Sequence, residues 1–303
     1  MKKETNTINK PHSIKKLFGE FMTQEELDAE YDVEKAVSNF GEYINVFQND
    51  SQKIRMLLKD RKAFAYGPTL METLTVYPSK KADAPVLLFI HGGYWRLGIG
   101  DDYDFVAVGP HEADFTVVII TYALAPHVNI PEMVRQVRSS IAWTARNISN
   151  YNGNAEKIFI AGHSAGAHLA AMAMTTDWST YGLAADTIKG VLAISGLYEL
   201  EPVSHTFVQP AIRITAEQIL YASPIRLIQP SQIQLIVAWG EKETPAFIRQ
   251  SEAYIRQWQN SGNEGNSLIV SKANHFNILN EFSSVEGIFT KAIVSLLKNV
   301  KSS

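Results

Sequence analysis

A serine between two glycines is the feature of this sequence that most directly indicates chemistry. The run GHSAG at 162–166 places Ser164 after an apolar stretch, Lys157 to Ala161, and before a run of small residues, Ala167 to Met174. This order predicts a strand, a tight turn and a helix. Such a turn exposes the serine hydroxyl, and it needs the glycines because side chains there would collide with neighbouring backbone. The pattern therefore predicts Ser164 as a nucleophile for acyl transfer.

A serine nucleophile in this setting requires an acid and then a histidine further along the chain. His275 is the histidine that follows both Ser164 and the candidate acids. Two carboxylates, Glu241 and Glu243, come after the apolar stretch 233–239. In esterases with such a serine turn, the acid usually stands three positions after a glycine at the end of the preceding strand, which is Gly240 here. We therefore expect Glu243 to orient the histidine, and Glu241 to be a solvated loop charge.

A pair of glycines is predicted to form the site that stabilises the oxyanion. The sequence HGGYW at 91–95 begins about seventy residues before the serine and follows an apolar stretch. In esterases such a loop brings backbone N–H groups to the substrate carbonyl, together with the amide that follows the nucleophile. These positions are Gly92, Gly93 and Ala165. We expect His91 to brace the loop by hydrogen bonding rather than to act on the substrate.

The elements that must position these residues alternate between strands and helices. Apolar stretches predict strands at 73–77, 85–91, 115–121, 157–161, 189–195, 233–239 and 267–271. Apolar residues three or four apart predict helices at 131–148, 247–258 and 288–297. Several strands are continuously apolar, as strands buried on both faces are. The alternation predicts the α/β class and a mostly parallel central sheet with helices on both faces. Together with the serine motif, it predicts an α/β-hydrolase fold.

The domain organisation is predicted to be simple. Residues 1–22 are expected to form a loose N-terminal tail, and 23–303 a single α/β-hydrolase domain. Residues 23–65 would be a helical N-terminal cap segment, whose first helix opens at the capping box Thr23 to Glu26. Residues 199–230 are irregular and contain four prolines. This insertion is predicted either to line or cover a pocket or to be a surface excursion.

Composition limits the partners and the compartment. The 303-residue chain has a formal net charge of −3 and basic runs no longer than pairs, so neither nucleic acid nor an anionic membrane is expected as a partner. It has no cysteine, which excludes disulfides and thiolate metal sites and predicts a reducing, cytoplasmic environment. The histidines lack metal-ligand spacing, so no metal is expected. The predicted partner is a small-molecule substrate, and a homodimer is compatible with the sequence.

Beyond these local patterns, the chain resembles the arylformamidase, or kynurenine formamidase-like, branch of the α/β-hydrolases from about residue 25 onward. The resemblance implies hydrolysis of N-formyl-kynurenine to kynurenine and formate, in tryptophan catabolism, by a serine, an acid and a histidine and with no cofactor. Members often carry Asp where this chain has Glu243, whose longer side chain must fold back to reach the imidazole. The matching stretches are 27–31 (LDAEY), 91–95 (HGGYW), 101–106 (DDYDFV), 122–126 (YALAP), 162–170 (GHSAGAHLA), 194–198 (ISGLY), 223–224 (SP), 243–247 (ETPAF), 250–251 (QS) and 274–276 (NHF).

Substrate recognition and two rival functions stay open at this point. Tyr94, Trp95 and Phe276 flank predicted catalytic positions and either stack on an aryl leaving group or pack in the core. Tyr31 either closes the pocket or anchors a helix by packing. One alternative function is a carboxylesterase for small-acyl esters. Another is a non-catalytic binding module, which the complete set of predicted catalytic residues disfavours.

Overall fold

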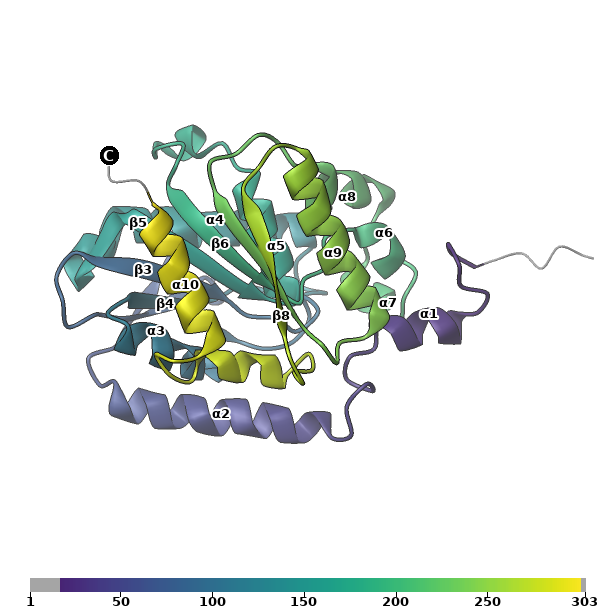
Figure 1. Ribbon diagram of the computed structural model, residues 1–303, viewed down its shortest axis with the longest axis horizontal. Coiled ribbons are helices and arrows are strands. Elements are labelled where there is room, and N and C mark those ends of the chain that lie inside the picture. The colour runs from purple at the N-terminus through teal and green to yellow at the C-terminus, as the bar shows by residue number, and fades with distance from the viewer. Residues whose placement is uncertain (1–16, 301–303) are drawn as a thin grey trace, which may run out of the picture.

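One central sheet organises the molecule. The structure, a computed structural model, describes residues 17–300, so most of the tail predicted for 1–22 lies outside the described residues. Within them the strand order is β1-β2-β4-β3-β5-β6-β7-β8 (Figure 1). The first two strands run antiparallel to their neighbours, and the pairs from β4 to β8 are parallel. The strands are β1 (Lys62–Ala65), β2 (Thr73–Tyr77), β3 (Ala84–Ile90), β4 (Thr116–Thr121), β5 (Gly153–His163), β6 (Ile188–Ile194), β7 (Gln234–Gly240) and β8 (Gly265–Val270).

Every strand predicted from an apolar stretch is present. The β4 and β6 strands are buried along almost their whole lengths, which explains their continuously apolar sequences. At one edge of the sheet, β8 exposes several residues. Sequence analysis missed β1, because its four residues, KAFA, are short and largely exposed and give no apolar run. This strand corrects the predicted helical segment 23–65, in which the last helix ends at Leu57.

Helices cover both faces of the sheet, as predicted. In Figure 1, α3 and α10 lie in front of the strands, and α4 and α5 lie behind them. The α4 helix begins where the side chain of Asn129 accepts a hydrogen bond from the Glu132 amide, and its buried residues follow helical spacing. These helices and α9 have the bounds α3 (Val108–Glu112), α4 (Ile130–Asn147), α5 (Ala165–Met174), α9 (Pro245–Asn260) and α10 (Ile288–Asn299).

The N-terminal segment forms two helices that lie outside the sheet layers. The capping box predicted at Thr23 is present and opens α1 (Gln24–Tyr31). The longer α2 (Phe40–Leu57) runs along the bottom of the molecule in Figure 1 and packs on η1 (Gly100–Ala107), a 3₁₀ helix. An ion pair of 2.8 Å between Arg55 and Asp104 joins α2 to η1.

The irregular segment 199–230 folds into short helices between β6 and β7. Its start is held by Gln250 on α9, whose Oε1 accepts the amides of Tyr198 and Glu199 at 2.9 and 2.8 Å. The short elements here are α6 (Leu200–Val203), α7 (Gln209–Ile212), α8 (Ala216–Tyr221) and η4 (Pro224–Arg226). Elsewhere the 3₁₀ helices are η2 (Ile148–Tyr151), η3 (Trp178–Tyr181) and η5 (Asn277–Phe282).

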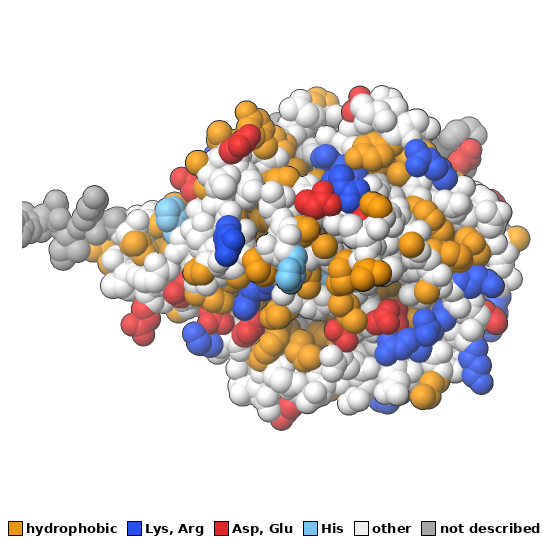
Figure 2. All heavy atoms as spheres, turned by 180° about the vertical axis from the view of Figure 1, so that it is seen from behind, with side chains coloured by type: hydrophobic (Ala, Val, Ile, Leu, Met, Phe, Trp, Pro, Cys, Tyr) orange, Lys and Arg blue, Asp and Glu red, His pale blue; other side chains and the backbone are white. Residues whose placement is uncertain are grey.

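Acidic and basic side chains are interspersed on the face shown in Figure 2, with apolar side chains scattered between them. No helix within residues 17–300 has both the length and the apolar character needed to cross a membrane. The same residues contain no group of three or more histidine or acidic side chains placed to hold a metal ion.

Candidate active site

Ser164 stands on a strained turn between β5 and α5. Its backbone angles are φ 56° and ψ −120°, in a region that side-chain-bearing residues rarely adopt. The turn is held by a 2.8 Å hydrogen bond from the Ser164 amide to the carbonyl of Ile194 on β6. A β-carbon on Gly166 would lie 2.0 Å from the Ile90 carbonyl oxygen, and one on Gly162 would lie 2.3 Å from that of Gly166. The two glycines are therefore required by close backbone packing under the serine.

Two neighbouring loops bring the carboxylate of Glu243 to the imidazole of His275. The Nδ1 atom of His275, after β8, lies 2.9 Å from Oε2 of Glu243, after β7. The loops are tied together by a 2.8 Å bond from the Lys242 amide to the Ala273 carbonyl. Both side chains are almost fully buried, and Oε1 of Glu243 has no partner within residues 17–300. Because Nδ1 donates to the carboxylate, Nε2 is the basic nitrogen of the neutral ring.

Glu241 occupies a different position from Glu243. Its carboxylate is exposed and accepts hydrogen bonds from the Lys272 amide at 2.8 Å and the Ser271 hydroxyl at 2.9 Å. These bonds lower the pKa of Glu241. The carboxylate thus braces the loop after β8, and of the two candidate acids it is Glu243 that contacts His275.

Ser164 and His275 line one cavity of about 300 Å³. Its apolar wall comes largely from the segment before and within α2, and its polar lining includes Glu34, Gln48 and Asp102. No residue of 199–230 belongs to this lining. The N-terminal segment therefore forms part of the cavity wall, and the insertion 199–230 does not line this cavity. The apolar lining includes Val33, Phe40, Ile44, Phe47 and Phe276.

The glycine loop after β3 approaches the serine closely. A β-carbon on Gly92 would lie 3.0 Å from the Cβ of Ser164. Gly93 lines the cavity with φ +106°, and a β-carbon there would lie 2.1 Å from the Leu97 carbonyl oxygen. Ala165 is the first residue of α5, where an amide has no acceptor within the helix. The glycine loop and the first residue of α5 thus both lie next to Ser164.

The loop after β4 supports the glycine loop from behind. The Ala125 amide donates to the Trp95 carbonyl at 2.8 Å, and the Tyr122 hydroxyl donates to the His91 carbonyl at 2.9 Å. His91 braces the loop as expected, since its Nδ1 lies 2.8 Å from the Gly92 carbonyl. Burial lowers the pKa of His91 to about 4, so this ring is neutral.

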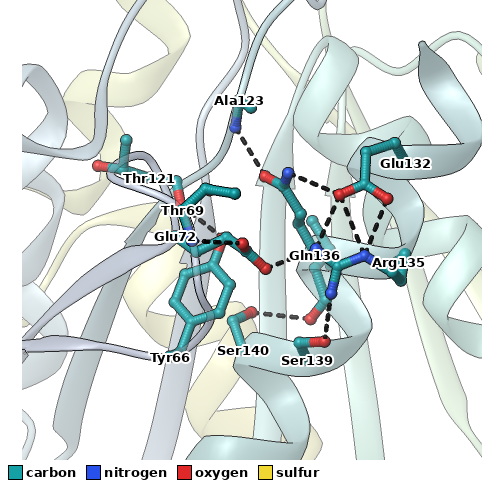
Figure 3. A network of polar contacts seen from close by, with 11 residues as sticks. Tyr66, Thr69, Glu72, Thr121, Ala123, Glu132, Arg135, Gln136, Ser139 and Ser140 are labelled. Atoms are coloured by element: carbon teal, nitrogen blue, oxygen red, sulfur yellow. Dashed lines mark hydrogen bonds and ion pairs between the residues drawn. The ribbon is translucent and has the colours of Figure 1, made fainter. Parts of the chain in front are cut away.

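A polar network on α4 in turn supports the loop after β4 (Figure 3). Gln136 accepts the Ala123 amide at 2.8 Å and donates to Glu132 at 2.9 Å. Arg135 joins Glu132 to the fully buried Glu72, which it contacts at 2.6 Å. The position of the glycine loop therefore depends on side chains of α4 that lie outside the cavity lining.

The four predicted substrate-binding residues do not all reach the cavity. Tyr94 and Phe276 line it, but Trp95 and Tyr31 do not. Trp95 is fully buried and donates its indole N–H to Nδ1 of His168 at 3.2 Å. The Tyr31 backbone carbonyl accepts a hydrogen bond from the Tyr94 hydroxyl. Tyr94 and Trp95 are adjacent in sequence and both have positive φ, and their ring centroids lie 6.2 Å apart although only Tyr94 lines the cavity.

Sequence analysis missed two parts of the lining. Phe40, Ile44 and Phe47 come from α2, where their spacing of three and four residues was a usable helical signal. His163 also lines the cavity. No sequence signal distinguished that position from His168, which lies outside the lining.

Comparisons with known proteins identify the family and the fold of this chain. The BD-FAE family model matches residues 74–257, more than half of the chain. The kynurenine formamidase of Salmo salar is 31% identical over 265 residues, covering 84% of this chain and 88% of that protein. That of Danio rerio is 29% identical over 289 residues, covering 91% and 97%. The solved structure of an esterase from Pyrobaculum calidifontis has a TM-score of 0.66 at 18% identity, covering 92% and 96%, and confirms the predicted fold class.

Proposed function

Because this chain belongs to the BD-FAE family of α/β-hydrolases, we propose that it removes the formyl group from an aryl formamide such as N-formyl-kynurenine. The observation that carries the proposal is the cavity lined by both Ser164 and His275, with Glu243 bonded to the far side of the imidazole. The hydrolase class itself follows from the kynurenine formamidases and esterases to which the chain is similar.

In the proposed mechanism Ser164 attacks the formyl carbon, and Nε2 of His275 takes the hydroxyl proton. The buried carboxylate of Glu243 stabilises the imidazolium that forms, and it holds the ring in the required tautomer. The imidazolium then gives its proton to the aryl nitrogen as the C–N bond breaks. Water, activated by the same imidazole, attacks the formyl-enzyme and releases formate.

The surroundings of Ser164 suit the charges and groups of this reaction. The amides of Gly93 and Ala165 would stabilise the oxyanion that develops on the formyl oxygen. The rings of Tyr94 and Phe276 border the cavity and would pack on the aryl group. In this proposal the protein needs no cofactor and acts in cytoplasmic tryptophan catabolism, and the lack of cysteine suits a reducing compartment.

The preferred size of the acyl group distinguishes the proposed formamidase from a carboxylesterase, the main alternative. We expect the purified protein to hydrolyse N-formyl-kynurenine with a higher kcat/KM than aryl butyrates, because overfilling a rigid acyl site costs about 1–3 kcal/mol. The assay compares N-formyl-kynurenine with aryl esters of increasing chain length under the same conditions. Better turnover of butyryl and longer esters would instead support a carboxylesterase, the activity named for similar proteins such as the esterase LipC of Mycobacterium tuberculosis.

A further inference from the structure

His163, directly before the nucleophile, has one ring nitrogen engaged and one free. Its Nε2 lies 2.8 Å from the backbone carbonyl of His275. A carbonyl can only accept, so Nε2 must carry the proton. The ring is only 3% exposed, and burial, together with the nearby His275, lowers the pKa of His163 well below its usual range. Nδ1 is therefore an acceptor with no proton of its own.

This free acceptor lies beside the nucleophile. Nδ1 is buried and has no hydrogen-bond partner in the described part of the chain. His163 lines the same cavity as Ser164 and His275. A β-carbon placed on Gly92 would lie 3.1 Å from Nδ1 and 3.0 Å from the Cβ of Ser164, so Nδ1 and the nucleophile lie close together. A buried acceptor without a donor is costly, and here its position makes a bound molecule the available donor.

The second histidine near the serine shows that free acceptors are not a general feature of this turn. His168, on α5, is fully buried like His163. Its Nδ1 accepts the Trp95 indole N–H at 3.2 Å, and its Nε2 lies 2.7 Å from the Ala222 carbonyl. Both nitrogens of this ring are therefore used inside the protein. It provides a matched control for His163.

We propose that Nδ1 of His163 accepts a hydrogen bond from the N–H of the scissile amide and so favours amides over the matching esters. This inference rests on the proposed function. An ester places an oxygen at that position, whose lone pairs face the lone pair of Nδ1. When the bond to carbon breaks, His275 gives its proton to the amide nitrogen, while the original N–H stays on that nitrogen and bonded to Nδ1. His163 thus acts on specificity and transfers no proton.

Two substitutions test the roles of the two ring nitrogens of His163 separately. The amide of Gln reaches about as far as Nε2, so His163→Gln keeps a donor for the His275 carbonyl and loses the acceptor at Nδ1. Asn is shorter, so His163→Asn places an acceptor near Nδ1 and loses the bond to that carbonyl. The probes are formanilide and phenyl formate, which differ only by N–H against oxygen, with rates corrected for spontaneous hydrolysis.

The expected readout is the ratio of kcat/KM for formanilide to kcat/KM for phenyl formate. In His163→Gln this ratio should fall roughly ten- to hundredfold, because the amide N–H is left without its acceptor. In His163→Asn the ratio should stay within about threefold, while a loosened His275 lowers both rates. His168→Gln, which disturbs a ring outside the cavity, should leave the ratio unchanged.

Other outcomes overturn the inference in distinguishable ways. A wild-type protein that hydrolyses phenyl formate but not formanilide removes the proposed function, and this inference with it. Active wild type with an unchanged ratio in His163→Gln removes the inference alone and assigns the ring to packing or to a bound water. If His163→Gln does not fold, the wild type is tested instead with N-methylformanilide, which lacks the N–H. An equal kcat/KM for N-methylformanilide and formanilide would overturn the proposed hydrogen bond to Nδ1 of His163.

Discussion

The polar network on α4 and the surroundings of Ser164 use buried polar groups in opposite ways. In the network of Figure 3, Glu72 accepts the Thr69 amide at 3.1 Å and Arg135 at 2.6 Å. None of the residues labelled there has a buried side-chain nitrogen or oxygen without a partner. At the candidate site, by contrast, Oε1 of Glu243 and Nδ1 of His163 are buried and have no partner within residues 17–300.

This difference distinguishes residues that support the loops from residues that take part in the reaction. Closed hydrogen-bond networks fix the backbone, and the network on α4 holds the loops behind the glycine motif. Open acceptors cost stability, but they leave room for a ligand to complete them. Variants in the network should therefore lose folding stability with little change in kcat. Variants beside the serine should lose kcat with little change in stability.

Replacing the nucleophile should give the largest effect. Ser164→Ala should lower kcat by roughly 10³-fold or more, because removing the nucleophile leaves only binding and oxyanion stabilisation. Its melting temperature should stay close to that of the wild type. The measurement is steady-state hydrolysis of an aryl formamide, with labelling by a serine-directed phosphonate, which should modify Ser164 of the wild type alone. A fully active alanine variant would remove the serine mechanism.

Replacing the acid should give the next largest effect. Glu243→Gln keeps the size of the side chain but removes the charge that stabilises imidazolium, and it can favour the wrong tautomer. The corresponding change in serine proteases costs about 10⁴-fold. The longer side chain makes the expected loss in kcat smaller here, at least about 10²-fold. Thermal unfolding should change little, because the amide oxygen of Gln can still accept the hydrogen bond from Nδ1 of His275.

Glu241→Gln is the matched control for the acid. This exposed carboxylate bonds only to the neighbouring loop, so kcat should stay within a few-fold of the wild type. The reverse pattern would transfer the role to Glu241. Near-normal activity in both variants would place the acid elsewhere in the chain.

Sequence alone could predict the parts of the site that short motifs encode. Ser164 is set by the residues immediately around it, and the order of segments along the strands selects His275. Glu243 follows from its spacing after a strand. Each of these depends on local backbone geometry or on chain order, which the α/β alternation fixes.

The lining of the cavity could not be predicted in the same way. Phe40 and Phe276 are far apart in sequence, yet their ring centroids lie 5.1 Å apart at the cavity wall. That contact depends on where α2 docks, which no single segment encodes. Trp95 and Tyr94 show the same limit at short range, because only one of these adjacent residues lines the cavity.

Breaking the network on α4 should mainly lower stability. Arg135→Met leaves the buried Glu72 carboxylate without its cation. We expect the free energy of unfolding to fall by about 2–3 kcal/mol, less than for a fully buried pair because the arginine side chain is 42% exposed. Urea unfolding measures this loss, and kcat per folded molecule should stay within a few-fold of the wild type. A large fall in kcat at normal stability would contradict the claim that the network on α4 supports the fold and takes no part in the reaction.

The surface pair Lys53–Asp50 on α2 is the control for that loss. Its atoms lie 2.6 Å apart, but both side chains are largely exposed. Lys53→Met should therefore change the free energy of unfolding by less than about 1 kcal/mol. A loss as large as that of Arg135→Met would show that ion pairing alone, rather than burial of Glu72, sets the effect.

The smallest effect expected outside the control variants concerns Asp104, the carboxyl that joins η1 to α2. Its side chain is fully buried, and burial raises its pKa to about 6 despite the hydrogen bond from Arg55. In the unfolded chain an aspartate titrates near about 3.9. Between these values the folded protein binds the additional proton. The stability associated with this carboxyl is therefore greatest below pH 4 and is lost as the pH rises through 6.

Asp104→Asn removes this titration while keeping the shape of the side chain. The free energy of unfolding of the wild type should fall relative to that of the variant by on the order of 1 kcal/mol between pH 5 and 7.5. The comparison uses urea unfolding of both proteins across that range, so other titrating groups cancel. Parallel curves would mean that Asp104 stays ionised throughout. Oδ1 of Asp104 is also buried without a partner, yet it lies outside the cavity lining. A pH slope here with unchanged kcat would show that this buried carboxyl affects stability and not the reaction.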